Sequence, residues 1–213
     1  MGLKNIASRL KTRYIDEHQL PDAAKVQLQQ DRAGLPQHDA GPGAVAAAGI
    51  EWLKRSQEMS FHHDGGSARD FSLIKGWASS YPETSGYIVP TLIDYADRTN
   101  DQNLADRAKR MLDWLVSIQF PEGGFQGGKV DADPHVPVTF NTGQILMGLA
   151  AGVRRFGDTY RAPMNLAAAW LRDSLDADGC WRKFATPFAA PGEKAYETHV
   201  SWGLFEAARL SPD

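Results

Sequence analysis

The chain has 213 residues, with 23 Lys and Arg against 26 Asp and Glu, so its net charge is −3. Its hydrophobic fraction of 42% is enough to bury a core and excludes a wholly disordered chain. The near balance of charge argues against a nucleic-acid partner, and the sequence has no apolar run of about 18 residues that would span a membrane. A single cysteine, Cys180, excludes an internal disulfide. With no signal-peptide core at the N-terminus, these features predict a cytoplasmic protein.

The first predicted element is an amphipathic helix over residues 3–15. Its apolar residues recur at helical spacing on one face, and its basic residues lie elsewhere. The pattern is compatible with a helix that lies on a membrane surface, but we expect the commoner case, in which the apolar face packs on the body of the protein. The apolar face consists of Leu3, Ile6, Leu10 and Tyr14, and the basic residues are Lys4, Arg9, Lys11 and Arg13.

A linker is predicted next, because residues 31–43 contain two prolines and three glycines. The composition changes after this stretch, where long apolar periodic segments begin. We therefore divide the chain into an N-terminal segment, residues 1–43, and a main domain, residues 44–213.

The main domain repeats itself. Three Trp-Leu pairs begin at Trp52, Trp114 and Trp170, which are 62 and 56 residues apart, and Gln57 and Gln119 follow the first two at the same offset. Apolar residues recur at helical spacing and strand signals are nearly absent, so the units are predicted to be helical hairpins of about 55–60 residues with the tryptophans in the core. Each unit then reaches a glycine turn, which reads Asp64-Gly65-Gly66, Glu122-Gly123-Gly124 or Asp178-Gly179.

Each hairpin contains a second helix whose start is marked by a polar residue. We expect these helices to begin near Ser85, Thr142 and Thr198. Because Pro90 lies inside the first of them, we expect either a kink there or a start as late as Val89. Neither helix of a hairpin buries its apolar face alone, so neighbouring hairpins must stack.

The repeat resembles that of known toroids. The spacing Gln119-x3-Gly123-x-Phe125 is similar to the Gln-x3-Gly-x-Trp repeat of squalene cyclases and prenyltransferases. The runs 72–91 and 140–144 resemble a bacterial (α/α)-toroid family that is associated with polysaccharide gene clusters and distantly related to six-hairpin sugar-processing enzymes. The resemblance implies an all-α fold, an (α/α) helical-hairpin toroid.

The chain departs from these families in two ways. Asp131-Ala132-Asp133-Pro134 has proline where the acidic motif of the cyclases ends in aspartate, which argues against isoprenoid cyclisation. A closed ring of six such hairpins needs on the order of 350 residues. We therefore expect a partial ring of about three to four hairpins, either truncated or completed by another chain, and self-association through its open edge.

The acidic candidates precede the inner helices, whose free N–H groups gather at one end of such a ring. Glu83 lies near Tyr81, and aromatic surroundings would raise its pKa and suit it to general-acid catalysis. Glu197 has the matching position one unit later, and two carboxylates in one cleft are what glycoside hydrolysis requires. Alternatively, each carboxylate caps its own helix. In a third interpretation His199 is a base, with Tyr81 or Tyr196 as the acid, as in lyases and epimerases.

Sugar-binding candidates lie at the same turns. The amides of Asn141 and Gln144 are suited to bonding sugar hydroxyls, although Asn141 is equally well placed to cap its helix. Three tryptophans outside the repeat positions, Trp77, Trp181 and Trp202, can stack on sugar rings.

The loop that contains His62, His63 and Asp64 is a weak metal candidate. Adjacent histidines on an extended loop point in opposite directions and rarely share one ion, so we expect no metal and no cofactor. Contact with substrate is the expected role of this loop. The predicted substrate-binding residues are Trp77, Tyr87, Asn141, Gln144, Tyr196, Trp202, His63 and Asp64.

The sequence thus favours a carbohydrate-active toroid protein. We expect it to act on a polysaccharide or a uronic-acid-containing glycan by acid–base chemistry, as a hydrolase, lyase or epimerase. Two alternatives stay open at this point: an isoprenoid-processing toroid enzyme, and a non-catalytic subunit that binds a glycan or a protein.

Overall fold

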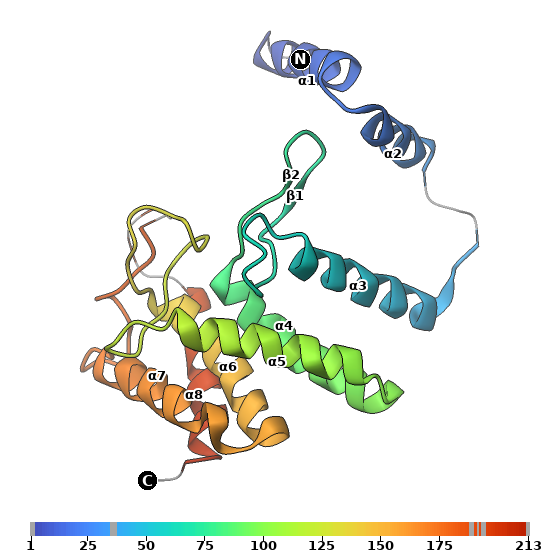
Figure 1. Cartoon of the computed structure of the whole chain (residues 1–213). Coiled ribbons are helices and arrows are strands. Elements are labelled where there is room, and N and C mark those ends of the chain that lie inside the picture. The colour runs from blue at the N-terminus through green and yellow to red at the C-terminus, as the bar shows by residue number, and fades with distance from the viewer. Residues whose placement is uncertain (1–2, 35–37, 188–189, 191, 193–194, 212–213) are drawn as a thin grey trace.

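The computed structural model describes residues 3–34, 38–187, 190, 192 and 195–211. Over these residues the chain is mostly helical, with long loops between some helices and one short β-hairpin (Figure 1). Within the same ranges, none of the helices is both long and apolar enough to cross a bilayer. The elements are α1 (Leu3–His18), α2 (Asp22–Ala33), α3 (Gly41–Glu58), β1 (Phe71–Ser72), β2 (Gly76–Trp77), α4 (Pro82–Thr99), α5 (Gln102–Ser117), α6 (Thr139–Phe156), η1 (Asp158–Tyr160), α7 (Arg161–Asp173), η2 (Ala195–Glu197) and α8 (Thr198–Ala208).

The body is a partial ring of helical hairpins, as predicted. Helices α4, α6 and α8 pack side by side as the inner layer, and α5 and α7 cover α4 and α6 from outside (Figure 1). The hairpins α4–α5 and α6–α7 are complete, α3 precedes them and α8 follows. The all-α toroid class and the estimate of three to four hairpins are therefore confirmed, and self-association through the open edge stays a prediction.

Glycine lets the inner helices approach closely. A β-carbon added to Gly86 of α4 would lie 2.5 Å from the Cα of Ile145 on α6. One repeat later, a β-carbon on Gly143 of α6 would lie 2.8 Å from the Cα of Val200 on α8. Since real β-carbons do not approach other atoms this closely, backbone packs on backbone at both contacts, and the spacing of the inner layer depends on these glycines.

Helix α4 begins earlier than predicted. It starts at Pro82, and not at Ser85 or Val89, because proline fits the first turn of a helix, where its missing N–H would have no partner. Pro90 lies inside the helix and leaves the Gly86 carbonyl without its usual donor. That carbonyl faces Gly148 of α6, whose added β-carbon would lie 2.7 Å from it, so the unbonded oxygen meets the neighbouring inner helix.

The Trp and Gly-Gly elements of the repeat form one contact between successive units. A β-carbon on Gly66 would lie 2.4 Å from the Trp114 ring, and one on Gly124 would lie 3.0 Å from the Trp170 ring. Each glycine turn therefore lies on the tryptophan of the next unit, and both of these tryptophans are buried as predicted. The expectation was wrong for Trp52, which is exposed because no preceding turn covers it.

The repeated glutamines stabilise the same turns by hydrogen bonds. The Gln119 amide donates to the carbonyls of Gly123 in its own turn and Pro163 in the next outer helix, both at 3.0 Å. Gln57 makes the equivalent bonds, to Gly65 at 2.9 Å and to Arg107 at 3.0 Å. The Gln-to-Gly spacing thus lets one side chain bond the carbonyl of its own glycine turn and a carbonyl of the next outer helix, which joins successive units.

The N-terminal segment differs from the prediction in two respects. The helix over residues 3–15 forms, but Ile6, Leu10 and Tyr14 of its apolar face are exposed and α1 stands away from the body with α2 (Figure 1), so the expected packing on the body is wrong. Helices α2 and α3 also occupy both ends of the predicted linker 31–43. Pro42 is accommodated because it lies in the first turn of α3. The division of the chain at residue 43 stays a prediction.

Candidate functional site

The loops that precede α4, α6 and α8 are tied together at the N-terminal ends of these helices. The Val130 N–H donates to the Ser80 carbonyl at 2.8 Å, which joins the second loop to the first. The Thr139 N–H donates to the Phe184 carbonyl at 3.0 Å, which joins the third loop to the second. The candidate residues on these turns therefore belong to one connected surface at one end of the inner layer.

Glu83 lies half-buried in the first turn of α4. Burial raises the pKa of its carboxyl group above the usual range. Its charge in turn helps to raise the pKa of the hydroxyls of Tyr81 and Tyr87, after the larger effect of their own burial, so both rings lie near it. Within the described part of the chain Glu83 accepts no hydrogen bond, and no side chain caps α4, so the capping interpretation is not supported for this residue.

Asn141 and Gln144 lie one turn apart on α6, with 4% and 0% of their surface exposed. The Asn141 Nδ2 and both amide atoms of Gln144 are buried without a hydrogen-bond partner. Helix α6 begins at Thr139 with no side-chain cap, so the capping interpretation of Asn141 is wrong. Buried amides of this kind cost stability unless a ligand or water bonds them, and such groups in a native protein are often functional.

Asn141 also connects the amide pair to the acidic residue. Its amide lies close enough to the Tyr81 hydroxyl to offset part of the rise in the pKa of that group, although it is outside hydrogen-bonding geometry. Because the charge of Glu83 also raises the pKa of Tyr81, the side chains of Glu83, Tyr81 and Asn141 converge at the junction of α4 and α6. The geometry brings a half-buried acid and a phenol to one junction with buried, unsatisfied amide groups.

Glu197 occupies the matching position before α8, as the repeat predicts. It is buried, which raises the pKa of its carboxyl group although the Thr139 hydroxyl donates to Oε2 at 3.2 Å. This bond ties the start of α8 to the start of α6. Beside it, the Tyr196 ring is exposed and meets the Phe140 ring edge-on at 4.8 Å.

The other tryptophan and histidine candidates are distributed differently. His199 and Trp202 are both exposed on α8, with their rings 6.3 Å apart. Trp181 is half-buried and its indole N–H donates to the Leu171 carbonyl at 2.9 Å, so its position is explained by packing on α7.

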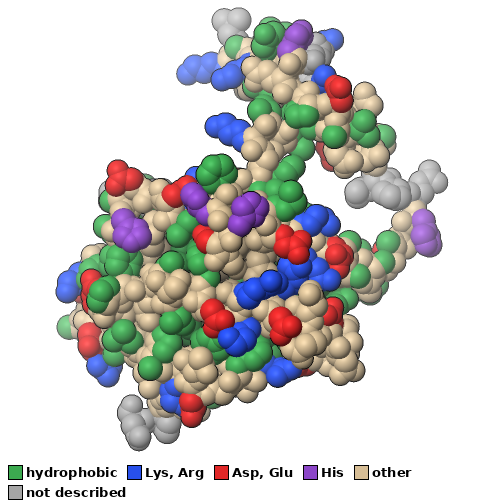
Figure 2. Space-filling view, in the orientation of Figure 1, with side chains coloured by type: hydrophobic (Ala, Val, Ile, Leu, Met, Phe, Trp, Pro, Cys, Tyr) green, Lys and Arg blue, Asp and Glu red, His purple; other side chains and the backbone are tan. Residues whose placement is uncertain are grey.

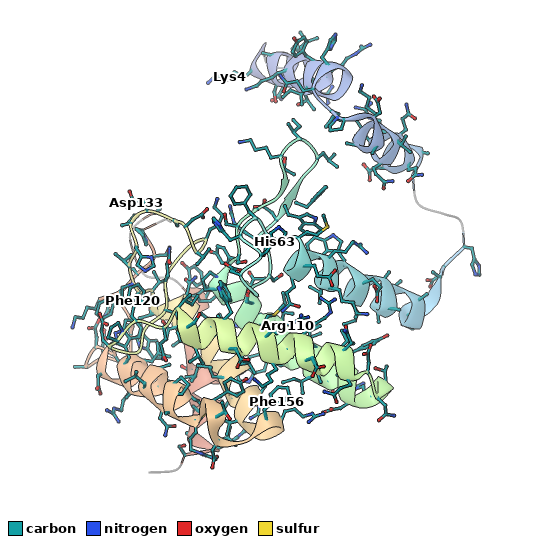
Figure 3. All side chains as sticks on the ribbon, viewed as in Figure 1. Lys4, His63, Arg110, Phe120, Asp133 and Phe156 are labelled. Atoms are coloured by element: carbon teal, nitrogen blue, oxygen red, sulfur yellow. The ribbon has the colours of Figure 1, made fainter. Side chains whose placement is uncertain are left out.

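The loop after α3 has internal partners for its candidate residues. His63, labelled in Figure 3, donates from Nδ1 to the Glu58 carbonyl at 2.7 Å. Asp64 accepts from the Ser80 hydroxyl at 2.5 Å and from the Gly66 N–H at 3.1 Å. These bonds give both residues a role in shaping the loop. Among the described residues, no group of three His, Cys, Asp or Glu side chains is arranged to hold a metal ion.

A pocket of about 450 Å³ lies beside this loop, and sequence analysis identified only its tryptophan, Trp77. Its cations come from distant positions, Arg69, Lys75 and Lys129, so no local motif marks them. The Arg69 guanidinium lies over the Tyr81 ring, 5.8 Å from its centre, which places the pocket next to the Glu83 surface.

Two acidic residues partly neutralise the positive charge of this pocket. Asp70 pairs with Arg69 at 3.5 Å. Asp131 accepts from the Ser79 hydroxyl at 2.5 Å and from His62 at 3.3 Å; these bonds, together with the nearby Lys129, lower the pKa of its carboxyl group. Lys75 has no such partner in the described ranges, so it is the cation most available to a ligand.

The fold and the connected turns place this chain in the class of (α/α) helical-hairpin toroids. No family model and no curated protein matches the sequence. Solved structures do match in three dimensions, and the chain spans about half the length of each.

Three of these structures illustrate the match. The first is a possible member of the GH105 family from Salmonella enterica serovar Paratyphi A, with a TM-score of 0.62 and 11% identity over 81% of this chain and 51% of that chain. A possible GH105 member from Klebsiella pneumoniae has a TM-score of 0.59 and 11% identity, over 80% and 50%. A family 88 glycosyl hydrolase from Bacteroides vulgatus has a TM-score of 0.55 and 16% identity, over 76% and 54%. At these identities the likeness establishes the fold.

Proposed function

We propose that this protein binds a uronic-acid-containing glycan and acts on it by acid–base chemistry at Glu83. The observation that carries the proposal is the buried, unpartnered Nδ2 of Asn141, which converges with Tyr81 and Glu83, together with the unpartnered Gln144 amide one turn further along α6. Sugar hydroxyls both donate and accept hydrogen bonds, so a glycan whose binding displaces the side chains that cover these buried atoms would satisfy the free amides. The resemblance to toroids of polysaccharide gene clusters, and the naming of the structural neighbours as a possible GH105 member and a family 88 glycosyl hydrolase, support a carbohydrate substrate.

Glu83 has the properties of a general acid. Because burial raises the pKa of its carboxyl group, a larger fraction is protonated near neutral pH than for an exposed glutamate. A protonated carboxyl can transfer its proton to the oxygen of a leaving group, which is the acid step of glycoside hydrolysis. Activity is then expected to fall as the pH rises through this pKa.

The neighbouring pocket supports the acidic part of the substrate. Trp77 provides an aromatic surface for a sugar ring, and Arg69, Lys75 and Lys129 surround it with positive charge. Since Arg69 also lies over Tyr81, a glycan bound in the pocket would continue toward Glu83.

The test is a thermal-shift and product assay with uronic-acid oligosaccharides and neutral oligosaccharides of equal length. Wild type would be compared with Glu83→Gln, with Lys75→Ala, and with Lys25→Ala, a control that removes one cation from α2. A ligand at 100 times its dissociation constant stabilises by about 2.7 kcal/mol, which is a rise in Tm of roughly 5–10 °C at this chain length.

We expect wild type to be stabilised by the acidic oligosaccharides and to release new reducing ends. Glu83→Gln should keep the shift and lose the product, whereas Lys75→Ala should weaken binding of acidic sugars alone. Product formation by Glu83→Gln at the wild-type rate would overturn the role of this acid. Binding without product in wild type would favour the non-catalytic alternative, and no shift with any sugar would refute the proposal altogether.

A further inference from the structure

Helix α1 presents an apolar stripe that the rest of the described chain leaves uncovered. Ile6, Leu10 and Tyr14 follow one another at four-residue spacing and are 44%, 63% and 57% exposed. Every residue from 4 to 14 is exposed, and α1 stands away from the helical body (Figure 1). An exposed stripe of this kind normally marks a contact with a partner.

The four cations of α1 lie along both edges of this stripe. At about 100° per residue, Lys4 and Lys11 fall on one side of Leu10, and Arg9 and Arg13 fall on the other. The face opposite the stripe carries uncharged polar residues, Asn5, Ser8 and Thr12.

The charge of α1 is also distinct from that of the remaining chain. Residues 3–15 contain four cations and no acidic residue, and Asp16 and Glu17 follow in the last turn of α1, so this helix has a net charge of +2, whereas the whole chain has a net charge of −3. Positive charge is therefore concentrated in the first three turns of α1, and basic side chains project from this end of the chain in Figure 2.

From this arrangement we infer that α1 docks on the surface of a bilayer that contains anionic lipid. The apolar stripe would enter the boundary between headgroups and acyl chains, and the flanking cations would reach the lipid phosphates. Tyr14, an aromatic side chain with a polar tip, suits the same depth. The inference is independent of the proposed function.

Two other partners fit the helix less well. A nucleic acid would use the cations but would leave the apolar stripe in water. A second copy of α1 would cover the stripe but would bring four like charges along each helix together, which destabilises a pair. An anionic membrane is the partner that accounts for the stripe and the charges at once.

The test is co-sedimentation of the full chain with vesicles of phosphatidylcholine and phosphatidylglycerol, and with vesicles of phosphatidylcholine alone. We expect binding to the anionic vesicles and its loss between roughly 0.1 M and 1 M salt, where the screening length falls from about 10 Å to 3 Å. Replacing Lys4 and Lys11 by Gln should weaken the partition about 5-fold per cation, or about 25-fold together.

Leu10→Glu and Thr12→Glu form the matched pair, because both add one negative charge to an exposed position of α1. Thr12→Glu should cost only the charge effect of about 5-fold, whereas Leu10→Glu should cost at least 10-fold more because it also removes apolar burial. Circular dichroism would check that both variants keep their helix content. Equal losses in the two variants, equal binding to the neutral vesicles, or binding to a DNA duplex without binding to vesicles would each overturn the inference.

Discussion

Two glutamines on this chain should respond to the same substitution with opposite signs. Gln119 donates to two backbone carbonyls, so Gln119→Met leaves the carbonyls of Gly123 and Pro163 without that donor. Gln144 is fully buried with neither amide atom bonded, so Gln144→Met removes an unsatisfied group at nearly constant volume. An unsatisfied buried polar group costs about 1–3 kcal/mol, which sets the size of both changes.

Thermal unfolding followed by circular dichroism measures the difference directly. For a chain of this length 1 kcal/mol corresponds to about 2–4 °C in Tm, so Gln119→Met should lower Tm and Gln144→Met should raise it, each by roughly 2–12 °C. Gln144→Met should at the same time abolish the shift produced by a bound glycan, as expected when a site is kept at the expense of stability. If Gln144→Met lowers Tm as much as Gln119→Met does, the Gln144 amide is satisfied in the unliganded protein and the argument for the site fails.

Two further predictions concern packing and charge. Gly86→Ala places a β-carbon 2.5 Å from the Cα of Ile145, so it should destabilise the protein by about 1–3 kcal/mol in urea unfolding. Gly49→Ala is the control, because Gly49 lies in open space within α3, and it should stabilise by up to about 1 kcal/mol. Equal effects of the two substitutions would contradict the close contact of α4 and α6. Burial raises the pKa of Glu83 in the folded protein. The contribution of Glu83 to the free energy of unfolding is therefore fully present below the unfolded pKa of about 4.3, and it is lost as the pH rises through the folded pKa. The Tm of wild type should therefore fall relative to the Tm of Glu83→Gln as the pH rises from 4 to 8. A constant difference between the two Tm values over that range would argue against burial of the acid.

Much of the fold was predictable because the repeat is a local pattern with a physical cause. The Gln119-to-Gly123 spacing places a side-chain amide next to a turn carbonyl, and the Gly-Gly pair is required by a tryptophan ring that lies on it. The same periodicity located the turns that hold Glu83, Asn141 and Gln144. Predictions failed at the open ends of the pattern, because Trp52 and α1 have no neighbouring unit to cover them.

The surroundings of the candidate residues depend on contacts between units. The repeat marks Gln119, but no sequence pattern shows that the Gln144 amide is buried without a partner, because that is decided by residues far away in the chain. The pocket cations Arg69, Lys75 and Lys129 likewise meet only after two loops are joined by the bond between Val130 and Ser80.

The sequence by itself determined the helical-hairpin repeat, the partial ring and the end of the ring at which chemistry is expected. These follow from periodicity and from turn residues, which act over a few positions. Tertiary structure alone decided which side chains are buried, which lack a partner and which charges meet. Burial and pairing are set by the surface of the neighbouring unit, so they appear only when the helices are stacked.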